Sequence, residues 1–233
     1  MVDIQPRQYY TEFHPEASIT QPWNAWSSVL FLLPVVFWLI RLRGEYKPYF
    51  MLVAILPLAV VNGVGSFLWH AHSGGALYLK LDTYPPRIML AFLGVYFLRL
   101  VTRNWLVGLI LFVAFAALVL EYKEQARPLL NVSWVTFNYI FNALIVIVPA
   151  LLVLVLYRGR GWGYFLLTVL CLVGAVWFRM LDGQRPLPEL MPQGTHFLWH
   201  LLCALAYLPL GYYLIRLEDA YRQKRKVTKV SAA

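Results

Sequence analysis

The chain has 233 residues, of which 61% are apolar and only 13% are charged, whereas charged residues make up about 25% of an ordinary soluble domain. So much apolar surface excludes a water-soluble globular domain of this size and favours a protein whose helices are solvated by lipid. The formal net charge is +9, but the basic residues lie in short clusters between apolar runs, so no basic face for binding nucleic acid is expected.

Seven segments are long and apolar enough to cross a bilayer, which takes about 20 residues of helix. In chain order they are residues 22–40, 49–69, 76–98, 104–120, 129–156, 162–178 and 194–215. The third segment gives the weakest signal, because it carries Lys80, Asp82 and Arg87. The pattern predicts an all-α integral membrane protein, a bundle of seven transmembrane helices.

The charges of the loops predict the orientation of this bundle. The loops and the tail on one side carry 13 of the 20 Lys and Arg residues but only 3 of the 11 acidic residues. The positive-inside rule places that side and the C-terminus in the cytoplasm, and the N-terminus outside or in a lumen. We therefore expect an N-terminal extramembrane segment (1–21), a transmembrane domain (22–217) and a basic cytoplasmic tail (218–233) that attracts anionic lipid.

Four of the five histidines fall in two pairs, each at the predicted outer end of a span. His196 and His200 open the last span, and a spacing of four places them on one helix face, where one helix can offer two ligands to a zinc ion. His70 ends the second span and shares a face with Ser66. His72 points elsewhere if the helix continues, since two residues rotate it by about 200°. We therefore expect His70 as the third ligand and hold His72 in reserve.

Asp82 lies at the outer start of the third span, and a turn at residues 73–75 returns it to the depth of the histidines. Three histidine ligands leave zinc a fourth position for water, whose pKa the ion lowers from about 15.7 to about 7. Asp82 is then expected either to take a proton from this water or to hold a ligand histidine, and Ser66 to donate to an oxyanion. Simpler roles stay open: Asp82 could pair with Lys80 or Arg87, and Ser66 could bond to its own helix.

The ordered set Ser66-x3-His70, Asp82 and His196-x3-His200 on seven spans resembles the alkaline ceramidase family, a member of a superfamily with the adiponectin/progestin receptors and the Per1-like lipid-remodelling proteins. The N-terminal stretches Tyr10-Thr11-Glu12 and Gln21-Pro22-Trp23-Asn24-Ala25-Trp26-Ser27 are similar to the family's Cys-Glu and Glu-Pro-x-Asn-x-x-Ser/Thr motifs. The resemblance implies a zinc ion held by the three histidines and a water, assisted by Asp82 and Ser66. It also implies hydrolysis of the amide of ceramide to a sphingoid base and a fatty acid.

Eukaryotic members of this family hold a calcium ion in the N-terminal segment. This chain retains Glu12 from that site but has Thr11 in place of the cysteine and Gln21 in place of the later glutamate. With Glu12 as the one matched carboxylate, a calcium ion would need further oxygen ligands, such as those of Asp3 and Glu16.

The short loops favour a bacterial member of the family in the inner membrane, whose lipid substrate need not be ceramide; a eukaryotic member would be expected in the endoplasmic reticulum or Golgi. Two other functions stay open. One is a phospholipase-like hydrolase of a lipid ester, which would use the same residues. The other is a receptor or scaffold with a structural zinc ion, in which His72 or Asp82 would complete a closed site of four protein ligands.

Overall fold

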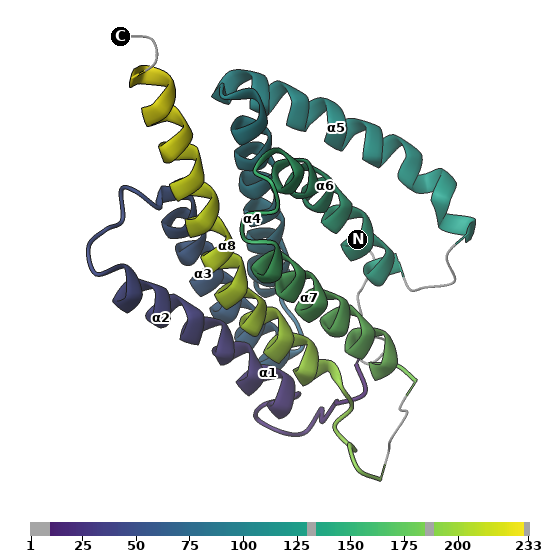
Figure 1. The fold of residues 1–233 in the computed structure, drawn as a ribbon. Helices are drawn as coiled ribbons and strands as arrows, with labels where there is room; N and C mark the ends of the chain where they lie inside the picture. The colour runs from purple at the N-terminus through teal and green to yellow at the C-terminus, as the bar shows by residue number, and fades with distance from the viewer. Residues whose placement is uncertain (1–9, 130–133, 185–188, 231–233) are drawn as a thin grey trace. The chain divides into compact units, whose positions relative to one another are not determined.

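The computed structural model describes residues 10–129, 134–184 and 189–230, and all regular secondary structure in these ranges is helical. The helices are labelled in Figure 1. They are α1 (Pro22–Ser28), η2 (Val29–Phe31), α2 (Leu32–Leu42), α3 (Phe50–His72), α4 (Ala76–Thr102), α5 (Trp105–Ala126), η3 (Arg127–Leu129), α6 (Trp134–Leu156), α7 (Trp162–Asp182) and α8 (His196–Val230).

Seven helical stretches in the described residues are long and apolar enough to span a membrane, which confirms the predicted number. They cover Pro22–Leu42, Phe50–His72, Ala76–Thr102, Trp105–Lys123, Thr136–Leu156, Trp162–Asp182 and His196–Lys224. The first is built from α1, η2 and α2 in succession. The third predicted span is helical as well: it forms α4 although it carries Lys80, Asp82 and Arg87.

The predicted ends of the helices differ most at the C-terminus. α8 does not stop near residue 217, where the basic tail was expected to begin, but continues to Val230. An ion pair of 3.2 Å between Glu218 and Arg222, four residues apart on α8, stabilises this extension. Lys and Arg are also good helix formers, so basic residues alone do not end a helix.

The chain packs into two compact units. The first combines Met1–Arg41, Leu56–Pro86 and Thr168–Leu208, and the second combines Leu42–Ile55, Arg87–Leu167 and Pro209–Ala233. Every residue predicted for the zinc site, and the predicted calcium ligand, belongs to the first unit. One of the two units thus holds all the candidate site residues.

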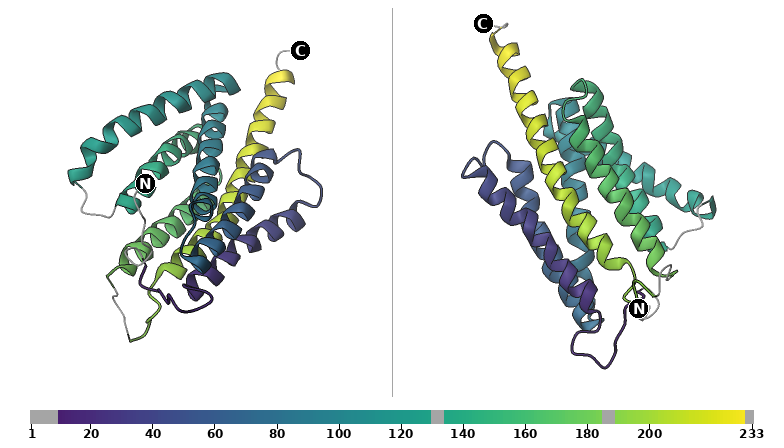
Figure 2. Two further views of the ribbon diagram at one scale, coloured as in Figure 1. Left: turned by 180° about the vertical axis from the view of Figure 1, so that it is seen from behind. Right: turned by 60° about the horizontal axis from the view of Figure 1, so that its bottom comes forward.

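In the first unit, α2 lies beside the first half of α8, as Figures 1 and 2 show. The buried indole of Trp38 donates a hydrogen bond of 3.0 Å to the carbonyl of Tyr207. The segment before α1 returns to the end of α3, where Thr20 N donates to the Ala71 carbonyl (2.9 Å) and Thr20 Oγ1 to the His70 carbonyl (2.9 Å). These bonds hold the N-terminal segment beside the predicted site.

The predicted reversal between α3 and α4 is present. Ser73 and Gly75 have φ values of 46° and 92°, in the left-handed region that a tight turn requires. Beyond the turn the two helices approach closely, because a Cβ on Gly65 would collide with the backbone of Leu81. This close contact brings the start of α4, with Asp82, against the last turns of α3.

In the second unit, charged residues of the spans pair with one another. The buried carboxylate of Glu218 accepts a hydrogen bond of 2.9 Å from Tyr96 and lies 3.2 Å from Arg222 and 3.9 Å from Arg99. The Arg99 guanidinium also lies over the Tyr221 ring, 4.2 Å from its centroid. Buried charges of this kind are tolerated because they are paired.

Candidate metal centre

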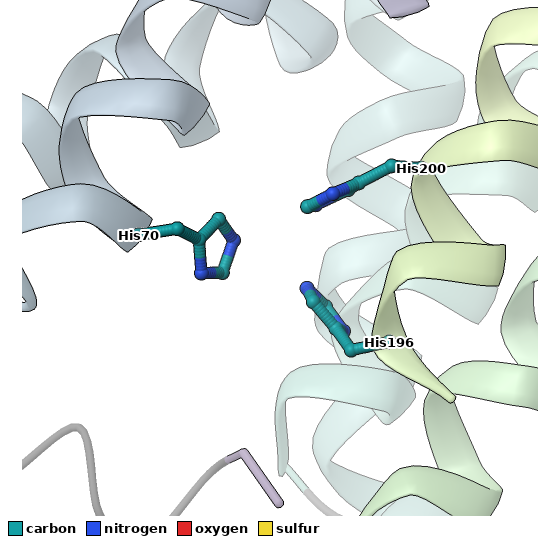
Figure 3. Close-up of side chains that lie close together, drawn as sticks. All are labelled: His70, His196 and His200. Atoms are coloured by element: carbon teal, nitrogen blue, oxygen red, sulfur yellow. The ribbon is translucent and has the colours of Figure 1, made fainter. Parts of the chain in front are cut away.

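Three histidine side chains converge in the first unit (Figure 3). His70 projects from α3, and His196 and His200 project from α8. One ring nitrogen can be chosen from each so that the three atoms all lie within 4.8 Å of one another. The side chains are removed from solvent, with residue exposures of 1%, 2% and 2%. Small side-chain rotations would bring three nitrogens to one ion, in the manner of a catalytic zinc site.

The start of α8 is fixed by Asp182, the last residue of α7. Its Oδ1 accepts hydrogen bonds from Thr195 N (2.7 Å) and His196 N (2.9 Å), so it satisfies two N–H groups at the helix N-terminus. Its Oδ2 accepts from Thr11 N at 2.9 Å. Gly194 has a φ of 79°, and a Cβ there would collide with Asp182 Oδ1 and Thr11. Asp182 thereby sets where α8 begins, and with it the placement of His196.

Polar partners orient two of the histidine rings. Gln21 Oε1 lies 2.7 Å from His70 Nδ1. Because a carbonyl oxygen only accepts, His70 Nδ1 carries the proton and its Nε2 is left with a lone pair. Ser27 Oγ lies 2.8 Å from His200 Nδ1, which occupies that nitrogen in the same way. In metal sites, such partners fix the tautomer and the direction of the ligand ring.

Asp82 is held from α3 by Asn62 and Ser66. Asn62 Nδ2 donates to the Asp82 main-chain carbonyl (2.6 Å) and lies 3.5 Å from its Oδ1, and the Ser66 side chain is hydrogen-bonded to the Asp82 carboxylate. Ser28 Oγ is 3.0 Å from Ser66 Oγ and 3.4 Å from His200 Nδ1. A run of polar atoms thus connects the carboxylate to a histidine of the cluster.

The Ser66 hydroxyl has one proton, and the carboxylate of Asp82 is an acceptor only. In this arrangement the proton is directed to Asp82 and orients the carboxylate. The role of Ser66 as a donor to an oxyanion stays a prediction, and it would require the proton to leave Asp82.

Tyr10 and Arg179 lie at the cluster as well. The Tyr10 ring packs against His70 and His196, with centroid distances of 4.9 and 4.5 Å. Burial raises the pKa of Tyr10 above its usual value, so the phenol keeps its proton at neutral pH. The positive charge of Arg179 acts on Tyr10, and the guanidinium lies 5.3 Å from the ring centroid of Trp199. Its charge acts on all three histidines and on Asp82.

Glu12, the predicted calcium ligand, caps α1. Its Oε1 accepts from Trp23 N (2.9 Å) and its Oε2 from Asn24 N (3.0 Å). Burial raises the pKa of Glu12, and these two bonds oppose that shift. Of the other oxygens considered, Glu16 is exposed and Asp3 lies outside the described residues. Calcium at Glu12 stays a prediction, and it would have to share an already engaged carboxylate.

His72, the reserve ligand, lies away from the cluster. It is exposed at the end of α3, and its ring centroid is 5.5 Å from that of Tyr78. His72 therefore points away from the face of α3 that carries His70, as the helical rotation of two residues predicts.

Five residues near the cluster were missed by sequence reasoning: Tyr10, Gln21, Ser27, Arg179 and Asp182. Arg179 and Asp182 carried a signal in the sequence, since a charged residue in an apolar span is costly and marks a candidate site. Gln21 and Ser27, like Tyr10, were visible only as parts of the quoted motifs. Their partners, His70 and His200, are 49 and 173 residues away, and no local spacing reveals such pairs.

The donor set fits zinc. Imidazole nitrogen is a ligand that zinc accepts readily, as copper, iron and nickel do, and three protein ligands are the number found in catalytic zinc sites. Among the described residues, these histidines are the one group of three or more His, Cys, Asp or Glu side chains with metal-binding spacing.

Comparisons of the chain with protein-family models, with curated proteins and with solved structures give no match. The resemblance to alkaline ceramidases accordingly rests on the motif residues. Of these, the structure brings His70, His196 and His200 together and places Ser66 in contact with Asp82.

Proposed function

We propose that this protein is a zinc-dependent hydrolase within the membrane that cleaves an acyl bond of a lipid, with the amide of a ceramide-like N-acyl sphingoid lipid as the leading substrate. The observation that supports the proposal is the convergence of three buried histidines in the packed unit that also holds the Asp82–Ser66 pair. Catalytic zinc sites have three protein ligands and keep a position open for water or substrate.

Each residue of the candidate site has a proposed role in this hydrolysis. His70, His196 and His200 would hold the ion, and Gln21 and Ser27 keep two of the rings in the required tautomer. Zinc bound there would lower the pKa of water and polarise a carbonyl group.

Asp82 accepts the proton of the attacking water and passes it to the leaving amine, as a general base and then a general acid. Asn62 and Ser66 orient its carboxylate for both steps.

Zinc binding is tested with variants of two histidines from the same helix end. His70→Ala removes a ligand, whereas His72→Ala removes an exposed imidazole two residues away. We expect the wild-type protein and His72→Ala to contain about one zinc ion per chain by elemental analysis. His70→Ala should lose both the zinc and the hydrolase activity. Equal zinc contents in the two variants would contradict the proposed ligand set.

The bond that is cleaved is identified by mass spectrometry of a membrane lipid extract after incubation with the zinc-loaded protein. A sphingoid base and a fatty acid in equal amounts support the amide substrate. Release of a lysolipid with a fatty acid would instead assign a phospholipase-like esterase. Zinc that stays bound without any lipid turnover would favour the receptor or scaffold with a structural ion.

A further inference from the structure

Hydrolysis of an amide or ester passes through a tetrahedral intermediate with a negatively charged oxygen, and enzymes place hydrogen-bond donors where this charge develops. Ser66, the donor suggested by the sequence, directs its one proton to Asp82. The proposed reaction therefore calls for another donor beside the histidine cluster.

Tyr10 is a hydroxyl-bearing side chain that packs on the cluster, and it differs from Ser27 and Ser28, whose hydroxyls donate to the Asn24 carbonyl. Its ring contacts two of the three histidines, one from α3 and one from α8, at 4.9 and 4.5 Å between centroids. The segment that carries it is fixed on both sides. Thr11 is bonded to Asp182, and Glu12 caps α1 through Trp23 N and Asn24 N. Tyr10 is thus anchored at the cluster by its neighbours along the chain.

Arg179 is the positive charge that acts on the Tyr10 hydroxyl. A guanidinium has five N–H donors and no acceptor, so towards Arg179 the phenol oxygen can serve only as an acceptor. The phenol proton then remains for donation to another atom. The adjacent positive charge makes the O–H group a stronger donor, because hydrogen bonds that involve an ionised partner polarise one another.

We propose that Tyr10 is a further catalytic residue, which donates a hydrogen bond to the oxygen of the scissile carbonyl as that oxygen becomes negative, with Arg179 as its positioning residue. This inference rests on the proposed hydrolase function and extends it. The N-terminal segment then completes the active site, in addition to supporting it.

The test compares Tyr10→Phe with Tyr78→Phe in the purified, zinc-loaded full chain on the lipid that the wild type cleaves. Both changes remove one hydroxyl and keep the ring, and Tyr78 lies beside His72, outside the cluster. We expect Tyr10→Phe to retain its zinc and its melting temperature and to lose roughly 10²–10³ of kcat with little change in KM, as on removal of one oxyanion donor. Tyr78→Phe should keep the wild-type rate.

Arg179→Gln supplies the second measurement. If Arg179 acts through Tyr10, the variant slows the wild-type protein but adds little further loss to Tyr10→Phe, so the two losses are not additive. Multiplied losses in the double variant would assign Arg179 a separate role and overturn the pairing.

Three outcomes overturn the proposal for Tyr10 in distinguishable ways. An unchanged kcat in Tyr10→Phe, with an active wild type, overturns this inference alone. Loss of zinc or of melting temperature in Tyr10→Phe assigns the hydroxyl a structural role. A zinc-loaded wild type that is inactive on every lipid overturns the proposed hydrolase function, and this inference with it.

Discussion

Gln21 determines which nitrogen of His70 faces the centre of the cluster. Its Oε1 accepts from His70 Nδ1 and from Asn24 Nδ2, and its Nε2 donates to Ser73 Oγ at 2.9 Å. The amide is fully buried, and each of its polar atoms has a partner. A side chain fixed on both ends cannot rotate freely, so it holds the imidazole in one orientation.

We therefore predict that Gln21→Leu, which keeps most of the side-chain volume but removes the acceptor, weakens zinc binding. Loss of a partner of this kind typically costs 10–100-fold in metal affinity. Competition with a zinc chelator measures the change, and Gln125→Leu at an exposed position of α5 is the matched control. Equal zinc affinities in the two variants would show that Gln21 does not orient the ligand.

For individual residues, the sequence predicted those features of the site that depend on spacing along one helix. Helix geometry predicted that His196 and His200 share a face and that His70 is preferred to His72, whereas the meeting of the two helices at one ion was expected from their common depth and from the family resemblance. The cap formed by Asp182 and the Tyr10–Arg179 pair could not be predicted, because they depend on how α7 and the N-terminal segment pack. A single sequence does not encode such tertiary contacts in any local pattern.

On the scale of helices, α4 shows how a break in regular bonding serves the site. Pro85 and Pro86 lie inside α4 and have no N–H to donate. Pro86 leaves the Asp82 carbonyl, four residues earlier, without a donor from its own helix. The buried Asn62 supplies that donor from α3, at 2.6 Å. Asn62 thus has two roles: it satisfies the main-chain carbonyl of Asp82, and it holds Asp82, the residue proposed as the proton acceptor, in place.

A pair of substitutions separates these two roles. We expect Asn62→Leu to lower stability by about 1–3 kcal/mol, because it leaves the part-buried Asp82 carbonyl without this partner. Adding Pro86→Ala should recover most of this loss, since the alanine introduced there would offer its own N–H to the Asp82 carbonyl. Thermal unfolding in detergent measures both effects. A double variant no more stable than Asn62→Leu would contradict the bonding scheme.

Hydropathy predicted the seven helices well because each span needs an apolar run of fixed length. Their ends were less predictable. α8 passes through the expected boundary at residue 217 because charged residues such as Glu218 and Arg222 pair along the helix, and hydropathy does not register that support.

For the molecule as a whole, the two units differ in what their charged residues do. In the second, Glu218 pairs with both Arg99 and Arg222, and its pair with Arg99 ties α8 to α4. In the first, the charge of Arg179 acts on the histidines, and Asp82 is connected to His200 through Ser66 and Ser28. The charged groups of the second unit are therefore structural, whereas the first unit holds both a structural carboxylate, Asp182, and the groups proposed as catalytic.

The orientation in the membrane remains a prediction of the loop charges, and it can be tested at two exposed positions. An odd number of spans places the termini on opposite sides, with the basic side in the cytoplasm. After replacement of Cys171 and Cys203 by alanine, Glu16→Cys should react with a membrane-impermeant maleimide in intact cells. Lys224→Cys should react only after permeabilisation.

The pattern of labelling separates two kinds of error. The reverse pattern would overturn the orientation and leave the seven spans in place. Labelling of both positions from one side would instead contradict the number of spans. With the predicted pattern, the end of α3 that holds His70 and the start of α8 face the outer side, because Thr20 bonds the N-terminal segment to the His70 and Ala71 carbonyls. Lipid of the outer leaflet would then lie nearest to the proposed active site.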